Sequence, residues 1–221
     1  MAQDVQRSPE RAKRLPRPVR EKQILDAAVE VFSRHGYHLA SMDEISDVAG
    51  VSKPMIYSYL GAKEELFGHC VRRESQRLLE AVRDGVRADV PPDMQLWHGL
   101  RSFYGFVAAY RESWIVLHRH ALTAGGPFAE EITALRARAV ALVRDLVVSA
   151  GTERGLASQA EFSGEGMAAA LVGAAESLAD WWLDHPDVAD GVLASWLMNL
   201  TWLGFNDLVE GHVWRPTEPA E

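Results

Sequence analysis

The sequence contains a single cysteine, Cys70, and no long apolar run. One cysteine cannot form an intramolecular disulfide, so the fold does not depend on an oxidising environment. The longest uninterrupted apolar run, residues 167–175, has nine residues, which is too few to span a membrane, and the first residues form no apolar signal segment. These absences predict a cytoplasmic protein without membrane contact. Cys70 is either a buried filler or a reactive sensor thiol.

Sequence motifs of catalysis are also missing. There is no nucleophile elbow, zinc-protease HExxH, phosphate-binding Walker loop or complete dinucleotide fingerprint, and the glycines at 164 and 166 follow no strand pattern. His118 and His120 are two positions apart, so on a helix they point to different faces and cannot share an ion. We therefore expect no catalytic residue, metal or cofactor. An enzyme whose polar residues converge only in space is the rival hypothesis.

The charge is unevenly distributed along the chain, whose formal net charge is −8. Residues 1–67 carry ten Lys or Arg and ten Asp or Glu, whereas the remaining 154 residues carry 13 and 21. Residues 1–19 are polar and proline-containing and are expected to be a disordered basic arm. Its cations either lie along DNA phosphates or enter a minor groove, or the arm is a solubilising tail without fixed contacts. The arm and the residue that follows it supply Arg11, Lys13, Arg14, Arg17 and Arg20.

Residues 37–67 are the most informative stretch. Ser41 followed by Glu44 predicts a capping box that opens a short helix, which Gly50 ends in the left-handed conformation. Ser52 can cap a second short helix with Pro54 in its first turn, where a missing N–H costs little. Two helices across a tight turn indicate a helix-turn-helix. The alternative is a structural helical hairpin in an all-α protein.

The second helix separates its residues by face. Val51, Ile56 and Leu60 can pack inward, while the opposite face is uncharged apart from Lys53 and can approach base edges closely. A third helix begins near Lys63, and its N-terminus can hold a phosphate. Residues 20–35 have an apolar face at helical spacing and predict a bracing helix that ends at Gly36.

These motifs resemble the DNA-binding domain of the TetR (tetracycline-repressor-like) family of transcriptional regulators. The resemblance covers roughly residues 20–67 and rests on the apolar positions of residues 24–37, followed by MDEISDVAGVSKPMIYSYL and KEELF. Leu60 stands where the family usually has Phe, and Gly61-Ala62 replaces its more common Pro-Ser pair. The resemblance implies that residues 52–59 form a recognition helix. It also implies that DNA is contacted by Ser41, Lys53, Pro54, Met55, Tyr57, Ser58, Tyr59 and Lys63. Within this set, Lys53, Pro54 and Met55 would face bases, while Ser41, Tyr57, Tyr59 and Lys63 would hold phosphates.

Downstream of residue 67 the sequence predicts only helices, because no alternating strand pattern is present. A helix that starts at Lys63 is expected to continue towards Asp89, so that it joins both domains. Its charged residues are expected on the solvated face; they are Arg72, Arg73, Glu74, Arg77, Glu80, Arg83 and Asp84. Residues 152–163 are expected to be a loop.

The family usually encloses a small molecule in its C-terminal domain, and large side chains with polar tips are concentrated in the middle of this chain. They predict an apolar pocket with few polar anchors, although residues at helical spacing also build plain cores. The candidate ligand-binding residues are Trp97, Phe103, Tyr104, Val107, Trp114 and His118.

Two long helices, at residues 166–184 and 187–209, carry more apolar surface than a lone hairpin covers. The resemblance implies that they form a four-helix interface in a homodimer; the alternative is that they seal the monomer core. The candidate interface residues are Leu171, Leu178, Val192, Trp196, Leu200 and Leu203.

The sequence thus predicts an all-α protein with a basic arm (1–19), a three-helix DNA-binding domain (20–67), a larger ligand-binding and dimerisation domain (68–215) and a tail (216–221). The leading hypothesis is a homodimeric repressor that binds a double-stranded, palindromic DNA operator and is released by a small apolar or amphipathic effector. The alternative is a DNA-binding regulator without an effector, controlled by a protein partner.

Overall fold

The computed structural model describes residues 15–87, 89–153, 155 and 157–209, and all regular elements in these residues are helical. The expected all-α class is confirmed. The cations at positions 11, 13 and 14 lie outside the described residues, whereas Arg17 and Arg20 lie in the first helix. The elements are α1 (Arg17–Leu39), α2 (Met42–Ala49), α3 (Lys53–Leu60), α4 (Lys63–Gly85), α5 (Pro92–Ala109), α6 (Arg111–Ile115), the π-helix η1 (Val116–Ala121), α7 (Leu122–Ala124), α8 (Gly126–Glu153), α9 (Ala157–Trp182) and α10 (Asp190–Val209).

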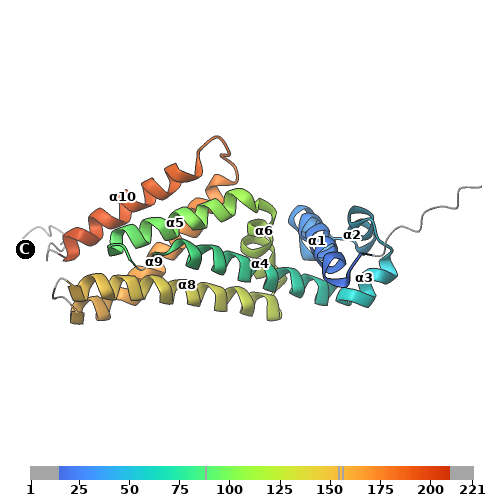
Figure 1. Ribbon diagram of the computed structural model, residues 1–221, viewed down its shortest axis with the longest axis horizontal. Coiled ribbons are helices and arrows are strands. Elements are labelled where there is room, and N and C mark those ends of the chain that lie inside the picture. The colour runs from blue at the N-terminus through green and yellow to red at the C-terminus, as the bar shows by residue number, and fades with distance from the viewer. Residues whose placement is uncertain (1–14, 88, 154, 156, 210–221) are drawn as a thin grey trace, which may run out of the picture.

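The N-terminal domain is the three-helix unit α1–α3, which lies at one end of the elongated molecule (Figure 1). The apolar face of α1 is fully buried at Ile24 and Phe32, and α2 and α3 contribute the equally buried Ile45 and Ile56. Helical geometry in α1 is interrupted at Gly36, with φ 70° and ψ 173°, a conformation that only glycine adopts without strain. The bracing helix was expected to end at Gly36, but α1 only kinks there and continues to Leu39.

Helix α4 joins the two domains. It begins beside α3 and runs into the larger C-terminal domain, where α5 and α8 pack against it (Figure 1). No helix break occurs between Lys63 and Gly85. The expected continuity is confirmed, although α4 ends before Asp89.

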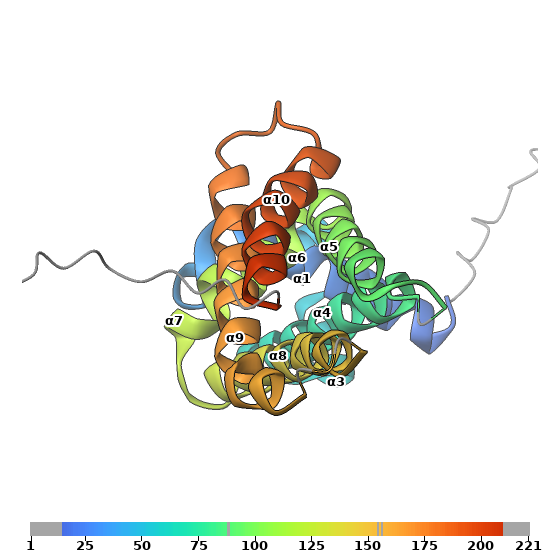
Figure 2. The ribbon, with the colours of Figure 1, turned by 90° about the vertical axis from the view of Figure 1, so that its left-hand side faces the viewer.

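The C-terminal domain is a bundle in which α8 and α9 form one antiparallel pair and α10 packs against α5 (Figures 1 and 2). The two final helices, α9 and α10, thus do not pack mainly against each other, because α9 packs mainly against α8 and α10 mainly against α5. The expected loop at residues 152–163 is also wrong, because α8 continues to Glu153 and α9 already starts at Ala157. In the first turns of α9 the side chains of Ser158 and Glu161 are exposed, as is Phe162 at 94%.

In the described part of the chain, no helix is both long enough and apolar enough to cross a lipid bilayer.

Candidate nucleic-acid interface and ligand cavity

The turn between α2 and α3 is built from local backbone chemistry. Ser41 Oγ accepts a hydrogen bond from the Asp43 backbone N–H at 3.1 Å and caps α2. Gly50 ends α2 in the left-handed conformation (φ 61°, ψ 35°), as expected. Glu44 does not complete the predicted capping box, because its carboxylate instead lies 3.1 Å from His35 Nε2 and 3.4 Å from Arg34 Nη1.

The predicted recognition residues lie on or beside α3 as the sequence indicates. Ile56 and Leu60 are buried against the domain core, while Pro54, Tyr57 and Ser58 are exposed. The remaining members of the set are an exposed Ser41 and the partly exposed Lys53, Met55, Tyr59 and Lys63. Helix α3 therefore presents a largely uncharged face beside the cationic side chains of Lys53 and Lys63.

The two lysines of this surface have different partners. Lys53 Nζ lies 2.9 Å from the Asp43 carboxylate, and this hydrogen bond raises the pKa of Lys53. Lys63 Nζ donates to the His38 carbonyl at 2.9 Å and lies 5.2 Å from the centre of the Tyr37 ring. Partial desolvation lowers the pKa of Lys63. Both cations are therefore held in place by neighbours on α1 or α2.

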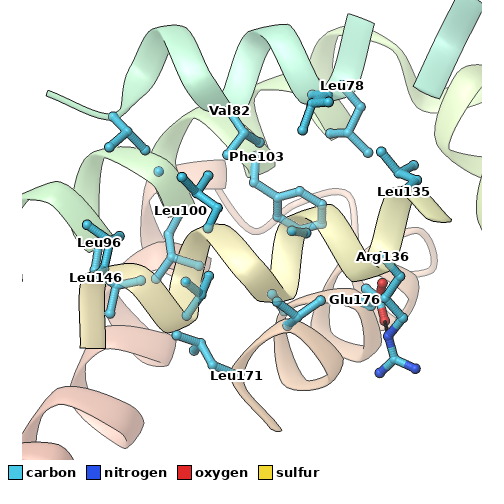
Figure 3. Close-up of a pocket in the computed structure, with 18 of the residues that line it drawn as sticks. Leu78, Val82, Leu96, Leu100, Phe103, Leu135, Arg136, Leu146, Leu171 and Glu176 are labelled. Atoms are coloured by element: carbon cyan, nitrogen blue, oxygen red, sulfur yellow. Dashed lines mark ion pairs between the residues drawn. The ribbon is translucent and has the colours of Figure 1, made fainter. Parts of the chain in front are cut away.

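A cavity of about 130 Å³ lies in the C-terminal domain (Figure 3). Its wall is almost entirely apolar and is built by α4, α5, α6, η1, α8 and α9. An ion pair stands at one end, where Arg136 Nε lies 3.2 Å from Glu176 Oε2. Burial raises the pKa of Glu176, and Arg136 acts in the opposite direction. The residues that Figure 3 labels are Leu78, Val82, Leu96, Leu100, Phe103, Leu135, Arg136, Leu146, Leu171 and Glu176.

Half of the candidate ligand residues line this cavity. Phe103, Trp114 and His118 are in its wall. Trp97, Tyr104 and Val107 are not: Tyr104 and Val107 belong to the buried core, and Trp97 packs against it partly buried. The Tyr104 ring is fully buried, its hydroxyl donates to the Ala175 carbonyl at 3.4 Å, and burial raises its pKa.

Most of the cavity wall consists of aliphatic residues that the sequence does not distinguish from core. Leu142 and Leu146 of α8, and Leu78 and Val82 of α4, recur at helical spacing like any buried face. Only the three-dimensional arrangement shows that the space between them is unfilled. The described residues contain no cluster of three or more potential metal ligands.

Two sets of contacts connect the cavity region with the N-terminal domain. His120 of η1 places its Nε2 3.1 Å from the Ser33 carbonyl of α1, while Leu117 and His118 of η1 line the cavity together with Trp114 of the preceding helix α6. On α4, the completely buried Glu74 accepts from Arg73 Nε at 2.5 Å and from Arg77 Nη1 at 3.0 Å. Arg73 Nη1 also lies 2.8 Å from the Asp26 carboxylate of α1. The expectation that Glu74 belongs to a solvated face is wrong, because these two arginines compensate its buried charge.

The candidate dimer residues divide into buried and exposed positions. Leu171 is 3% exposed and lines the cavity, so it is not available to a partner chain and that expectation is corrected. Leu178 is partly buried, and the side chain of Leu203 lies outside the described residues. Trp196 and Leu200 of α10 are 47% and 74% exposed. The candidate Val192 of α10 is 38% exposed, and one further exposed apolar side chain, Trp181 of α9, lies against Trp196.

Comparisons with known proteins match both domains of the chain to one family. Residues 24–70 match the family described as bacterial regulatory proteins, tetR family, and residues 92–204 match the tetracyclin repressor-like C-terminal domain. A TetR-like regulator of known structure from Rhodococcus is 39% identical, with a TM-score of 0.76 over 87% of this chain and 99% of that one.

Curated relatives match over shorter segments. The transcriptional activator FasR of Mycolicibacterium smegmatis is 41% identical over 97 residues, which is 44% of either chain. The chain spans less than half the length of the first curated relatives that it matches. FadR of Bacillus subtilis, solved in complex with stearoyl-CoA, is 19% identical with a TM-score of 0.67 over 86% of this chain and 98% of that one, and it shares the fold.

The C-terminal family alone covers just over half of the chain, and the DNA-binding family accounts for the helix-turn-helix before it. The chain therefore belongs to the TetR family of DNA-binding transcriptional regulators, which are not enzymes.

Proposed function

We propose that this regulator binds a palindromic DNA operator as a homodimer and releases it when an amphipathic molecule with a hydrocarbon chain enters the cavity. The observation that carries this proposal is the double role of α4. Its first residue, Lys63, belongs to the candidate DNA-binding surface, and its later residues Leu78, Leu79 and Val82 line the cavity. A ligand that displaces the far half of a continuous helix also displaces its start.

The nature of the wall supports an effector with a hydrocarbon chain. The cavity is similar in size to the roughly 150 Å³ apolar cavity that stays dry and binds benzene in an engineered protein. A longer chain must therefore move the surrounding helices apart to enter. Release needs only that the ligand favour the displaced arrangement by about 1 to 3 kcal/mol, which corresponds to a 5- to 150-fold loss of operator affinity.

The relatives' names support an acyl chain as the first class to test. The Bacillus subtilis FadR structure contains stearoyl-CoA, and a curated relative from the same species is named a fatty acid metabolism regulator. The cavity also favours a small-molecule effector over control by a protein partner alone. A regulator without an effector would be expected to have a fully packed C-terminal domain, and this domain contains a cavity.

The test is operator binding by fluorescence anisotropy, with a DNA fragment obtained by selection from genomic duplexes and acyl-CoAs of increasing chain length. We expect at least one chain length to release the DNA. Leu100→Trp, which fills the cavity, should leave DNA binding intact and remove the response. The matched control is Leu122→Trp, outside the cavity wall, which should respond as the unmodified protein does. If no amphipathic compound changes the affinity, effector control by this cavity is excluded.

A further inference from the structure

Lys53 and Asp43 form an ion pair at the start of α3, the predicted recognition helix. Lys53 is the first residue of α3, and its Nζ lies 2.9 Å from Asp43 Oδ1 and 3.0 Å from Asp43 Oδ2. Both carboxylate oxygens therefore lie within hydrogen-bond distance of one ammonium group. In a helix-turn-helix the first residues of the second helix contact base edges, so the pair occupies the part of α3 that is expected to read DNA.

The backbone of Asp43 is fixed by local hydrogen bonds. Its N–H donates to Ser41 Oγ at 3.1 Å, and its carbonyl accepts from Ser46 Oγ at 2.7 Å. Asp43 also lies in the first turn of α2, where the helix dipole favours a negative charge. The carboxylate is thus presented from a defined position, whereas a lysine ammonium is carried on a flexible four-carbon stem. Asp43 is consequently the member of the pair that can hold the other in place.

The pair is open to solvent and hence to a bound duplex. The side chains of Lys53 and Asp43 are 39% and 72% exposed. Exposed ion pairs add little to folding stability. The main consequence of this pair is therefore expected in DNA binding.

The pair changes what Lys53 can contribute to DNA affinity. A lysine without an acidic partner neutralises a phosphate and adds affinity that is independent of sequence. At Lys53, Asp43 already compensates the positive charge, and this hydrogen bond raises the pKa of Lys53. Lys63 provides the contrast. In the ranges that the structure describes, its Nζ donates to the His38 carbonyl and has no carboxylate partner, so its charge remains available to a phosphate.

Pairing leaves Lys53 with a positioned donor. An ammonium has three N–H groups and no acceptor. The Asp43 carboxylate takes one or two of them, so at least one remains for a base edge. In the major groove guanine presents two acceptors, N7 and O6, whereas adenine and cytosine present an amino donor and thymine presents a methyl group beside its acceptor. Guanine is therefore the base that best fits a lysine N–H at this position.

We propose that Asp43 is a positioning residue for base recognition, which holds the Lys53 ammonium away from the phosphates and directs it to a guanine in the major groove of the operator. This inference rests on the assignment of Lys53 to the bases and is independent of the effector cavity. Without Asp43, the ammonium would turn to the phosphates, because they carry the full negative charges of the duplex.

The experiment measures by fluorescence anisotropy how operator affinity of the full chain depends on base and on salt. The probes are the duplex selected from genomic DNA, its single-base variants, and the same duplex with 7-deaza-dG, which lacks the N7 acceptor. The 7-deaza-dG stands at the position where Lys53→Ala changes base discrimination. The unmodified protein should prefer guanine there by about 5-fold or more, and 7-deaza-dG should remove part of this preference.

Asp43→Asn removes the charge and keeps the shape of the side chain. We expect the preference for guanine to fall to about 2-fold or less, and the effect of 7-deaza-dG to disappear. The slope of log K against log salt should steepen by about 1 for each protomer, because Lys53 now neutralises a phosphate.

Asp47→Asn is the matched control. Asp47 is an exposed acid of the same helix and has no ion-pair partner in the part of the chain that the structure describes. Its replacement also removes one negative charge from the DNA-binding domain. It should strengthen binding to all duplexes alike and leave the preference for guanine unchanged.

A double-mutant cycle shows whether Asp43 acts through Lys53. In the Lys53→Ala background, Asp43→Asn should cause no further loss of base preference. If the preference falls by the same factor with and without Lys53, Asp43 contacts a base itself, as a carboxylate does with the cytosine amino group. The positioning role is then refuted.

Three other results would overturn the inference. If Asp43→Asn keeps the full preference for guanine and the same salt slope, Asp43 does not orient Lys53, although the base contact of Lys53 stands. If Asp43→Asn weakens binding to every duplex alike and lowers the urea midpoint of unfolding, the pair only ties α2 to α3. If Lys53→Ala leaves base discrimination unchanged, or no duplex is selected at all, the base contact or operator binding itself fails, and this inference fails with it.

Discussion

Lys53 and Lys63 are expected to contribute to DNA binding in different ways. Lys53 opens α3 beside the uncharged reading face, whereas Lys63 opens α4 and is held by the His38 carbonyl. Lys63→Ala should weaken binding to all sequences alike and reduce the slope of log K against log salt by about 1. Lys53→Ala should instead change discrimination at one base pair by about 1 to 3 kcal/mol. Anisotropy with an operator and its single-base variants, at several salt concentrations, measures both.

Glu64→Gln, an exposed change next to Lys63, is the control and should leave base discrimination unchanged. Equal losses on every sequence from both lysine variants would contradict the assignment of Lys53 to the bases.

At the scale of single residues, the sequence predicts side chains whose role follows from local geometry and misses those whose role is set by distant neighbours. Ser41 and Gly50 were predictable because a cap and a left-handed helix end depend on adjacent residues. Cys70 is fully buried, and burial raises its pKa, so the filler alternative is the correct one and a sensor thiol is not supported. The burial of Glu74 was not predictable, because a glutamate among charged neighbours such as Arg72, Arg73 and Arg77 is typical of a solvent-exposed helix face.

At the scale of elements, Glu74 connects three helices. Its two arginine partners extend to other elements, because Arg73 pairs with Asp26 of α1 and the Arg77 guanidinium lies 4.2 Å from the Tyr110 ring at the end of α5. Glu74→Gln keeps the shape but weakens two charge-assisted hydrogen bonds, so it should reduce the free energy of unfolding by about 2 kcal/mol. Urea unfolding at pH 7 measures this value.

Glu80→Gln on the same helix is the matched control. Glu80 is exposed and bonded only to Gln76 among the described contacts, so its loss should change the free energy of unfolding by less than about 0.5 kcal/mol. Equal stability of the two variants would show that the buried network around Glu74 does not stabilise the junction.

Helix positions were mostly predictable, and the exceptions have physical reasons. Prolines and glycines mark the starts of α3, α5 and α8, so those boundaries follow from the sequence. The π-helix η1, which packs against α1 on one side and lines the cavity on the other, has no signature in the local sequence. The first turns of α9 resemble a loop in composition because exposed helical residues and loop residues are both polar.

At the scale of the whole molecule, an exposed apolar surface on α9 and α10 remains after the monomer has folded. Trp181 and Trp196 lie 6.1 Å apart between ring centres, and both are at least 40% exposed. Large aromatic side chains on such a surface are typical of the centre of a protein interface. A two-fold dimer through this surface would present two reading helices to half-sites about 34 to 36 Å apart, or a multiple of that distance.

Leu200→Asp tests this dimer directly. Leu200 is 74% exposed, so a carboxylate there should leave the monomer folded but would be desolvated in an interface. We expect size-exclusion chromatography with light scattering to show a monomer at micromolar concentration, and operator affinity to fall by about 10²- to 10⁴-fold as the two reading heads lose their linkage. Leu122→Asp, an exposed change on α7, which packs against η1 and α8, should remain dimeric and bind DNA normally. A Leu200→Asp variant that stays dimeric with full affinity would place the interface elsewhere on the molecule.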